Sequence, residues 1–260
     1  MRRGGSLIAT LETSLYDEWG VRRPEFGLAD LFGVSVRKGR QGPLRNSYMR
    51  FEADAAGRRH PLLAGFEGTE QTVNGIWMVD VAATAPSGHP MTLVPPYPDL
   101  PMEKVFPTVT RTDIPTVYAR ELGPSRVVYF PIDIDRVFWE VLHTDHLRIL
   151  RNAFDWALSG VKPIEVEGPG LVEVTLWRQE RSMTAHLVNL SNPMMFKGPL
   201  RELLPVGAQR VTIAVPASAR VKAVKLLVSG TPVEHVASAG KITLTVPSVL
   251  DREVVAVDLA

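Results

Sequence analysis

The stretch that decides the fold is residues 126–160, RVVYFPIDIDRVFWEVLHTDHLRILRNAFDWALSG, because it holds a strand, a loop and a helix in succession. Residues 127–130 are apolar on both faces, which is typical of a parallel strand buried under helices on two sides. Pro131 ends the pairing because proline has no N–H to donate to a neighbouring strand. We therefore expect a buried strand over 126–130, followed by a charged loop over 132–136.

A helix is predicted from about Asp145 to Gly160. Thr144 suits the N-cap, and the carboxylate of Asp145 interacts favourably with the helix dipole in the first turn. Gly160 would end the helix, and Pro163 would prevent a restart. One apolar stripe with helical spacing is expected to be buried, and it consists of Leu147, Leu150, Phe154, Ala157 and Leu158.

The composition of the chain excludes several classes of protein. Its 260 residues are long for one domain and sufficient for two, and 29 Lys and Arg nearly cancel 28 Asp and Glu. A balanced charge predicts neither nucleic-acid binding nor attraction to an anionic membrane. The absence of cysteine excludes disulfides, thiolate metal sites and cysteine nucleophiles. No apolar run is long enough for a membrane span or a secretory signal, so we expect a soluble, cytoplasmic protein.

A second strand-and-loop unit lies at the start of the chain, where GGSLIAT (4–10) leads into the loop LETSLYDEWG (11–20). If strands 6–10 and 126–130 run parallel, both following loops leave the same edge of the sheet, where open α/β folds bind ligands. The side chains expected to share this patch are Glu12, Tyr16, Asp17, Trp19, Asp133, Asp135 and Arg136. We interpret the patch as a docking surface with Arg136 pairing an aspartate, rather than as a catalytic centre.

Two further segments of the first half are informative. Residues 37–46 are basic and glycine-rich, and we interpret them as a solvated turn rather than an anion site. Residues 92–116 are rich in proline and should be extended. Such a segment is usually a rigid loop wrapped over its own domain, and the alternative is a docking arm.

Beyond Pro163 the pattern changes to short segments rich in β-branched residues, several of them strictly alternating. Six such segments separated by turns predict an antiparallel β-sandwich of roughly a hundred residues. We therefore expect two domains, over residues 1–161 and 162–260.

Three stretches together resemble a known family. They are GGSLIATLETSLYDEWGVRRPEFGLADLFGV (4–34), LGPSRVVYFPIDIDRVFW (122–139) and LRNAFDWAL (150–158). They are similar to the β-galactosidase trimerisation domain of family 42 glycoside hydrolases and of related putative glycosyl hydrolases, in which a barrel, this domain and a small β-domain follow in series. The resemblance covers residues 3–40 and 115–160 well and the middle loosely.

The resemblance implies an α/β fold of the flavodoxin-like, class I glutamine-amidotransferase-like kind for residues 1–161, followed by the antiparallel β-sandwich. It enters partway through that fold, so its first strands are missing and the sheet should have an open edge. A fragment, a split gene or a misplaced start would each explain this. The chain also has no room for the usual (β/α)8 barrel of roughly 250 residues that carries catalysis in the family.

The resulting interpretation is a non-catalytic accessory region that needs no cofactor and holds no metal. Its expected partners are further copies of itself, possibly as a trimer, or a catalytic barrel. A small hydrolase using Glu12 or Asp17 with Asp133 or Asp135 is one alternative, because glycoside hydrolysis needs two carboxyl groups. A carbohydrate-binding module using an exposed Trp177 is another. The His143, Asp145, His146 motif lacks a third ligand, so we interpret it as capping and surface residues.

Overall fold

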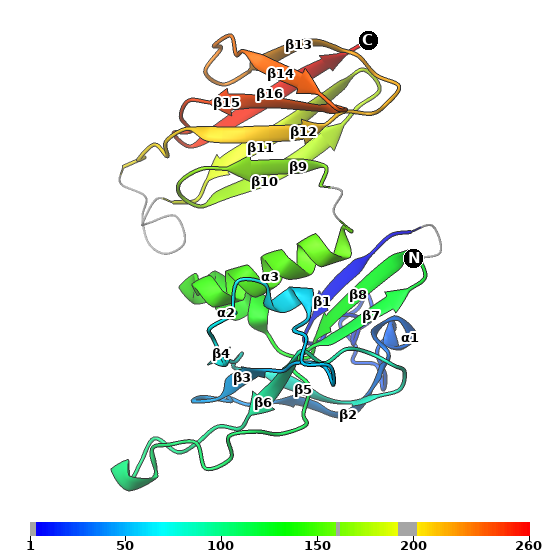
Figure 1. The fold of residues 1–260 in the computed structure, drawn as a ribbon, viewed down its shortest axis with the longest axis vertical. Coiled ribbons are helices and arrows are strands. Elements are labelled where there is room, and N and C mark those ends of the chain that lie inside the picture. The colour runs from blue at the N-terminus through cyan, green and yellow to red at the C-terminus, as the bar shows by residue number, and fades with distance from the viewer. Residues whose placement is uncertain (1–3, 160–161, 192–201) are drawn as a thin grey trace. The chain divides into compact units, whose positions relative to one another are not determined.

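The computed structural model describes residues 4–159, 162–191 and 202–260. The chain forms two compact units, Met1–Gly160 and Val161–Ala260, and each has a hydrophobic interior of its own (Figure 1). In the described parts of the chain, no helix is both long enough and apolar enough to cross a membrane. The two units are considered one at a time.

The first unit is dominated by short strands (Figure 1). Its elements, with η marking a 3-10 turn, are β1 (Leu7–Thr10), α1 (Ala29–Phe32), β2 (Val34–Gln41), β3 (Tyr48–Phe51), η1 (Pro61–Leu63), β4 (Gln71–Val73), β5 (Met78–Ala83), β6 (Met91–Val94), η2 (Met102–Lys104), β7 (Tyr118–Leu122), β8 (Ser125–Phe130), α2 (Ile134–Val141) and α3 (Thr144–Ala157). They form three small sheets, with the strand orders β1-β8-β7, β2-β5 and β4-β3-β6.

The predicted strand over 126–130 is confirmed as β8, and its parallel pairing with β1 is confirmed with Leu7 opposite Val127. Its two faces belong to different clusters. Val128 and Phe130 pack with residues of α3, whereas Val127 and Tyr129 pack on the other side, where Tyr129 stacks on Phe32 with ring centroids 4.4 Å apart. A strand buried on both faces accounts for its unbroken apolar run.

The predicted flavodoxin-like fold class is wrong. Strands hold 40% of the chain and helices 13%, and β1-β8 is the one parallel pair among the described strands. A parallel sheet needs a crossover of a dozen or more residues between neighbouring strands, usually a helix. Between β2 and β7 the chain instead forms antiparallel pairs, β2 with β5 and β3 with both β4 and β6.

The helical predictions also need correction. The segment 132–136 is not a loop throughout, because α2 begins at Ile134 and carries Asp135 and Arg136. α3 begins at Thr144, and His143 occupies the N-cap without a side-chain hydrogen bond. The predicted buried stripe is largely exposed, since Leu147, Phe154 and Leu158 face outward. The residues that face the interior are His146, Ile149, Ala153, Trp156 and Ala157.

The second unit is an antiparallel β-sandwich, as the sequence predicted. Its strands are β9 (Ile164–Glu167), β10 (Val172–Arg178), β11 (Ser182–Asn189), β12 (Gln209–Ala214), β13 (Val221–Leu226), β14 (His235–Ser238), β15 (Lys241–Val246) and β16 (Arg252–Leu259). They form two sheets, β10-β11-β16-β13 and β14-β15-β12-β9. The alternating apolar residues of β15 and β16 are buried between the sheets, which explains their period of two.

Candidate functional site

The loops that follow β1 and β8 leave the same edge of the sheet. Thr10 and Phe130, the last residues of these strands, lie side by side in the parallel register. The hydroxyl of Thr10 donates to Oδ2 of Asp135 over 3.0 Å, so the start of α2 is bonded to the end of β1. Most of the predicted patch belongs to this edge, but its members have different roles.

Asp133 is an internal structural anchor. Its side chain is 1% exposed, and Oδ1 accepts hydrogen bonds from the backbone N–H groups of Ile76 and Trp77 at 2.8 and 2.9 Å. Its Oδ2 accepts from Nε of Arg136 at 2.9 Å and from a second nitrogen of the same guanidinium. Both carboxylate oxygens are therefore engaged, as a buried charge requires.

The surroundings of Asp133 explain the local sequence. A Cβ atom on Gly75 would clash with Oδ1 of Asp133, so glycine allows the chain before β5 to approach the carboxylate. The hydrogen bond from Arg136 to Asp133 raises the pKa of the guanidinium, and Arg136 also contacts Glu140 at 2.7 Å. The predicted pairing of Arg136 with an aspartate is therefore present, and Asp133 links the start of α2 to the residues just before β5.

Glu12 lies in a separate group of contacts on the same edge. Its carboxylate accepts a hydrogen bond from the Tyr16 hydroxyl at 3.2 Å and lies 3.6 Å from the guanidinium of Arg40. Arg40 in turn stacks on the Trp77 ring, 4.9 Å from its centroid. Because the N–H of Trp77 also donates to Asp133, these two residues connect the halves of the patch. The sequence analysis identified neither residue, although the basic composition of residues 37–46 indicated a cation near this position.

Asp17 and Trp19 do not join this group in the structure. Oδ1 of Asp17 accepts hydrogen bonds from the backbone N–H groups of Trp19 and Val21, which closes the turn of its own loop. The Trp19 ring is 84% exposed and lies at the tip of that turn. Their visible role is to shape the loop and present an aromatic ring to solvent.

The chemistry available to the patch is that of a structural ion-pair network. A general acid or base needs a carboxylate free to exchange a proton with substrate, whereas Asp133 and Asp17 are occupied by backbone N–H groups. Among the described residues, no three His, Asp or Glu side chains are grouped to hold a metal ion. His146 is buried, contacts the carbonyl of Val73 at 2.9 Å, and has its pKa lowered mainly by burial.

Comparison with known proteins places this fold among parts of larger enzymes. No family model matches the chain. No curated protein matches its sequence either. Among solved structures, α-L-fucosidase isoenzyme 2 from Paenibacillus thiaminolyticus aligns over 100% of this chain and 37% of its own length, with a TM-score of 0.66 and 19% identity. A β-galactosidase from Bacillus circulans sp. alkalophilus aligns over 98% of this chain and 29% of its own, with a TM-score of 0.50 and 13% identity. The chain thus has the fold of a segment of about a third of the length of these glycoside hydrolases.

Proposed function

We propose that the chain is a non-catalytic accessory region of a glycoside hydrolase, which docks to a catalytic barrel and associates with further copies of itself. The fold likeness to a third of two such enzymes supports this assignment. The observation that carries it is an apolar surface that the first unit leaves uncovered at the open edge of its parallel strand pair.

This surface combines one face of α3 with the free edge of β1. Leu147, Phe154 and Leu158 are exposed, Phe154 to 57%, although their spacing is that of a buried helical stripe. Phe154 and Leu158 border a hollow of about 460 Å³ with Ile8 of β1. Exposed apolar groups that form a contiguous surface mark interaction sites.

The outer edge of β1 adds a second reason for a partner at this place. Among the described strands, β1 pairs with β8 alone, so its other edge presents unpaired backbone N–H and C=O groups. Such an edge is a template for another strand. A partner that adds a strand beside β1 would at the same time cover the exposed stripe of α3, so one docking event would satisfy both features.

A projecting segment supports self-association. Residues 95–113 extend away from the body of the first unit and turn at η2 (Figure 1). The segment is held near its root by the Tyr48–Tyr97 hydroxyl contact at 3.2 Å and by Arg111 bonded to Glu52 at 2.8 Å. We call it the arm.

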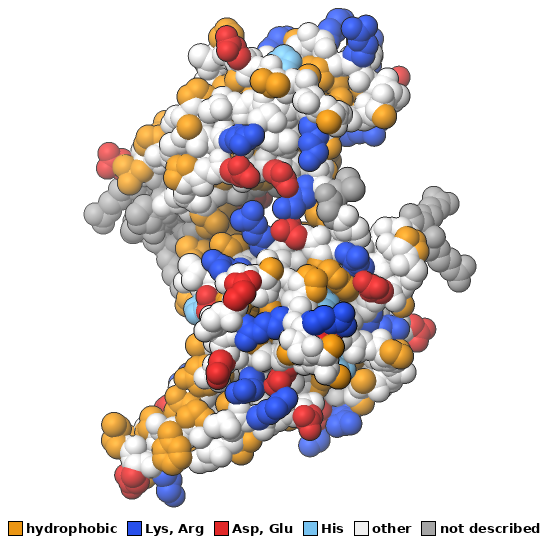
Figure 2. Space-filling model, viewed as in Figure 1, with side chains coloured by type: hydrophobic (Ala, Val, Ile, Leu, Met, Phe, Trp, Pro, Cys, Tyr) orange, Lys and Arg blue, Asp and Glu red, His pale blue; other side chains and the backbone are white. Residues whose placement is uncertain are grey.

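The arm carries exposed apolar side chains beside the charged Glu103 and Lys104 of η2. Leu100, Phe106 and Met102 are exposed, Met102 to 77%, and Figure 2 shows hydrophobic side chains gathered on the arm. Long segments without secondary structure of their own are usually functional in compact domains. The expectation of a loop wrapped over its own domain does not describe this segment, and its form favours the docking-arm alternative.

The test is the mass of the chain in solution by light scattering, at several concentrations, alone and mixed with the product of the adjacent upstream reading frame. We expect a defined oligomer that Met102→Ser with Phe106→Ser dissociates, and a stoichiometric complex with a barrel protein that Phe154→Asp abolishes. Val236→Ser is the matched control, because Val236 is an exposed apolar residue of β14 in the other unit. A monomer at every concentration that binds no barrel protein would contradict the proposal.

A second candidate function is carbohydrate binding by the sandwich. Trp177 on β10 is 61% exposed, as this alternative required. Aromatic rings are rigid, amphipathic contact surfaces, so Trp177 could stack on a sugar.

The hydrolase alternative predicts release of nitrophenol from nitrophenyl glycosides by the chain alone, and loss of this activity on substitution of Asp17 or Asp133.

A further inference from the structure

A cavity of about 560 Å³ lies in the first unit, and the loop after β1 and residues 133–136 do not line it. Its volume is within the usual range of small-molecule sites. One wall is the part of β5 that carries Met78, Asp80, Val81 and Ala82, whereas Val79 of the same strand packs in another cluster. The facing wall includes Leu93 of β6 and residues 113–115 at the root of the arm.

The cavity is held open by backbone pairing around its rim. The N–H of Leu93 donates to the carbonyl of Ile114 over 2.8 Å, and Thr92 forms a bridge with Pro115. His89 packs edge-on against the Tyr118 ring with centroids 4.9 Å apart. The walls therefore come from β2, β5, β6, β7 and the arm root, and they are fixed by the sheets rather than by a single loop.

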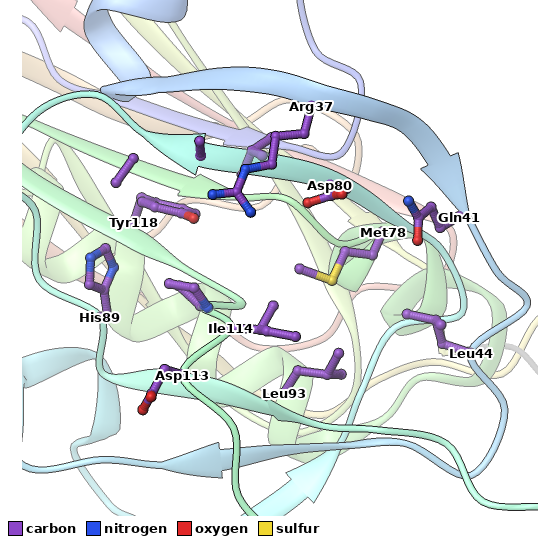
Figure 3. Close-up of a pocket in the computed structure, with 14 residues that line it drawn as sticks. Arg37, Gln41, Leu44, Met78, Asp80, His89, Leu93, Asp113, Ile114 and Tyr118 are labelled. Carbon is purple, nitrogen blue, oxygen red and sulfur yellow. The ribbon is translucent and has the colours of Figure 1, made fainter.

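Three polar groups converge on this space. Arg37 is the extra residue of a β-bulge between Val36 and Lys38, and a bulge redirects a side chain. Figure 3 shows its guanidinium inside the cavity, turned toward the Tyr118 hydroxyl, with the Asp80 carboxylate nearby. Among the described residues, the side chains of Arg37 and Asp80 form no salt bridge, and both interact electrostatically with Tyr118.

Tyr118 is the most informative member of the group. The residue is 2% exposed, its ring packs edge-on against His89, and it lines the cavity. Burial raises its pKa to about 12, so it is a neutral donor and acceptor at physiological pH. Figure 3 shows this hydroxyl on the side of the ring that faces Arg37 in the cavity, where it can donate to a ligand and accept from it.

The charge of the lining restricts the ligand. Arg37 contributes one positive charge, and Asp80 and Asp113 contribute two negative charges. An anion would meet the two carboxylates, and a cation would meet the guanidinium of Arg37. A neutral molecule with several hydroxyl groups can accept from Arg37, donate to the aspartates and do both with Tyr118. Its C–H face would rest on Met78, Leu93 and Ile114.

We propose that this cavity binds a neutral, polyhydroxylated ring such as a pyranose sugar, with Arg37, Asp80 and Tyr118 as its hydrogen-bonding residues. The site is independent of the docking surface and of Trp177. It would give the first unit a ligand of its own without any catalytic step.

The test uses the full chain and isothermal titration with D-galactose, D-glucose and their methyl glycosides, with glucuronate and glucosamine as charged comparators. We expect saturable binding of at least one neutral sugar with Kd on the order of 1 mM. Tyr118→Phe should weaken binding about three- to tenfold, because it removes one hydrogen bond and keeps the ring. Arg37→Met should weaken it about tenfold or more.

Lys38→Met is the matched control, since Lys38 neighbours Arg37 in β2 and does not line the cavity. Thermal unfolding of each variant checks that the fold is kept, and Tyr118→Phe carries the test if Arg37→Met does not fold. Preference for glucuronate or glucosamine would overturn the proposed ligand class. Absence of saturable binding, or binding that Tyr118→Phe leaves unchanged while Trp177→Ala removes it, would overturn the site.

Discussion

Replacement of Asp133 by alanine should destabilise the first unit strongly. The substitution leaves the N–H groups of Ile76 and Trp77 without their acceptor and removes the partner of Arg136. An unsatisfied buried donor costs about 1–3 kcal/mol, whereas Arg136 is partly exposed and can be hydrated. We expect the free energy of unfolding to fall by about 3–5 kcal/mol, mainly because two backbone donors lose their acceptor.

Urea denaturation followed by tryptophan fluorescence measures this loss. Four of the five tryptophans lie in the first unit, and Trp77 adjoins Asp133, so the signal reports mainly on that unit. With a slope of about 2 kcal/mol per molar, the midpoint should fall by about 2 M. Asp135→Ala is the control, because Asp135 is exposed and its bond to Thr10 should contribute less than about 1 kcal/mol.

A glycine pair tests the same contact from the other side. Gly75→Ala should destabilise by about 1–3 kcal/mol, because its methyl group would meet Asp133. Gly68→Ala should be nearly neutral, since that position is open. The reasoning is refuted if Asp133→Ala unfolds at the wild-type midpoint, and a loss of glycosidase activity at unchanged stability would instead favour the hydrolase alternative.

Three further outcomes follow from individual residues. Burial opposes ionisation of Glu253, but hydrogen bonds from the N–H groups of Val228, Val254 and Ser229 outweigh it and lower its pKa. Glu253→Gln should therefore cost the sandwich about 1–3 kcal/mol at pH 7, and the difference should shrink as pH falls below about 4.5, because the unfolded chain binds the proton first. Burial also lowers the pKa of His146, so the first unit should lose stability as pH falls below about 6.5, and His146→Gln should reduce that slope in denaturation series. If the sandwich binds sugars, Trp177→Ala should abolish any sugar-induced fluorescence change, and a wild-type signal indifferent to every sugar would dismiss that function.

The sequence predictions were correct where they depended on patterns within one segment and wrong where they depended on contacts between distant segments. The sandwich was predicted because alternation in segments such as 241–246 directly records which side chains face a core. The buried strand β8 was predicted because Val127 to Phe130 are apolar on both faces. The flavodoxin-like fold was not a local inference. It rested on resemblance at the two ends of the first unit, and the antiparallel pairs between β2 and β7 overturned it.

The stripe on α3 shows the limit of periodicity. Leu147 and Phe154 share a face with the spacing of buried residues, while Ile149, Ala153 and Trp156 on another face were overlooked. When a helix has apolar residues on two faces, its sequence does not show which face packs against its own domain. Prediction of the candidate patch was limited in the same way. Parallel pairing predicts that the loops after β1 and β8 lie close together, but it does not predict the contacts of Arg40 and Trp77.

The sequence by itself determined the sandwich and the β8 strand, because each depends on side-chain alternation or on a continuous apolar run. The parallel pairing of β8 with β1 was a condition in the sequence analysis, and the structure shows it. Only the tertiary structure decided which polar groups are satisfied. The carboxylate of Asp133 accepts from backbone donors, whereas the side chains of Arg37, Asp80 and Tyr118 line one cavity. These residues are distant in sequence, and their hydrogen bonding depends on how strands pair across long separations, which no local pattern encodes.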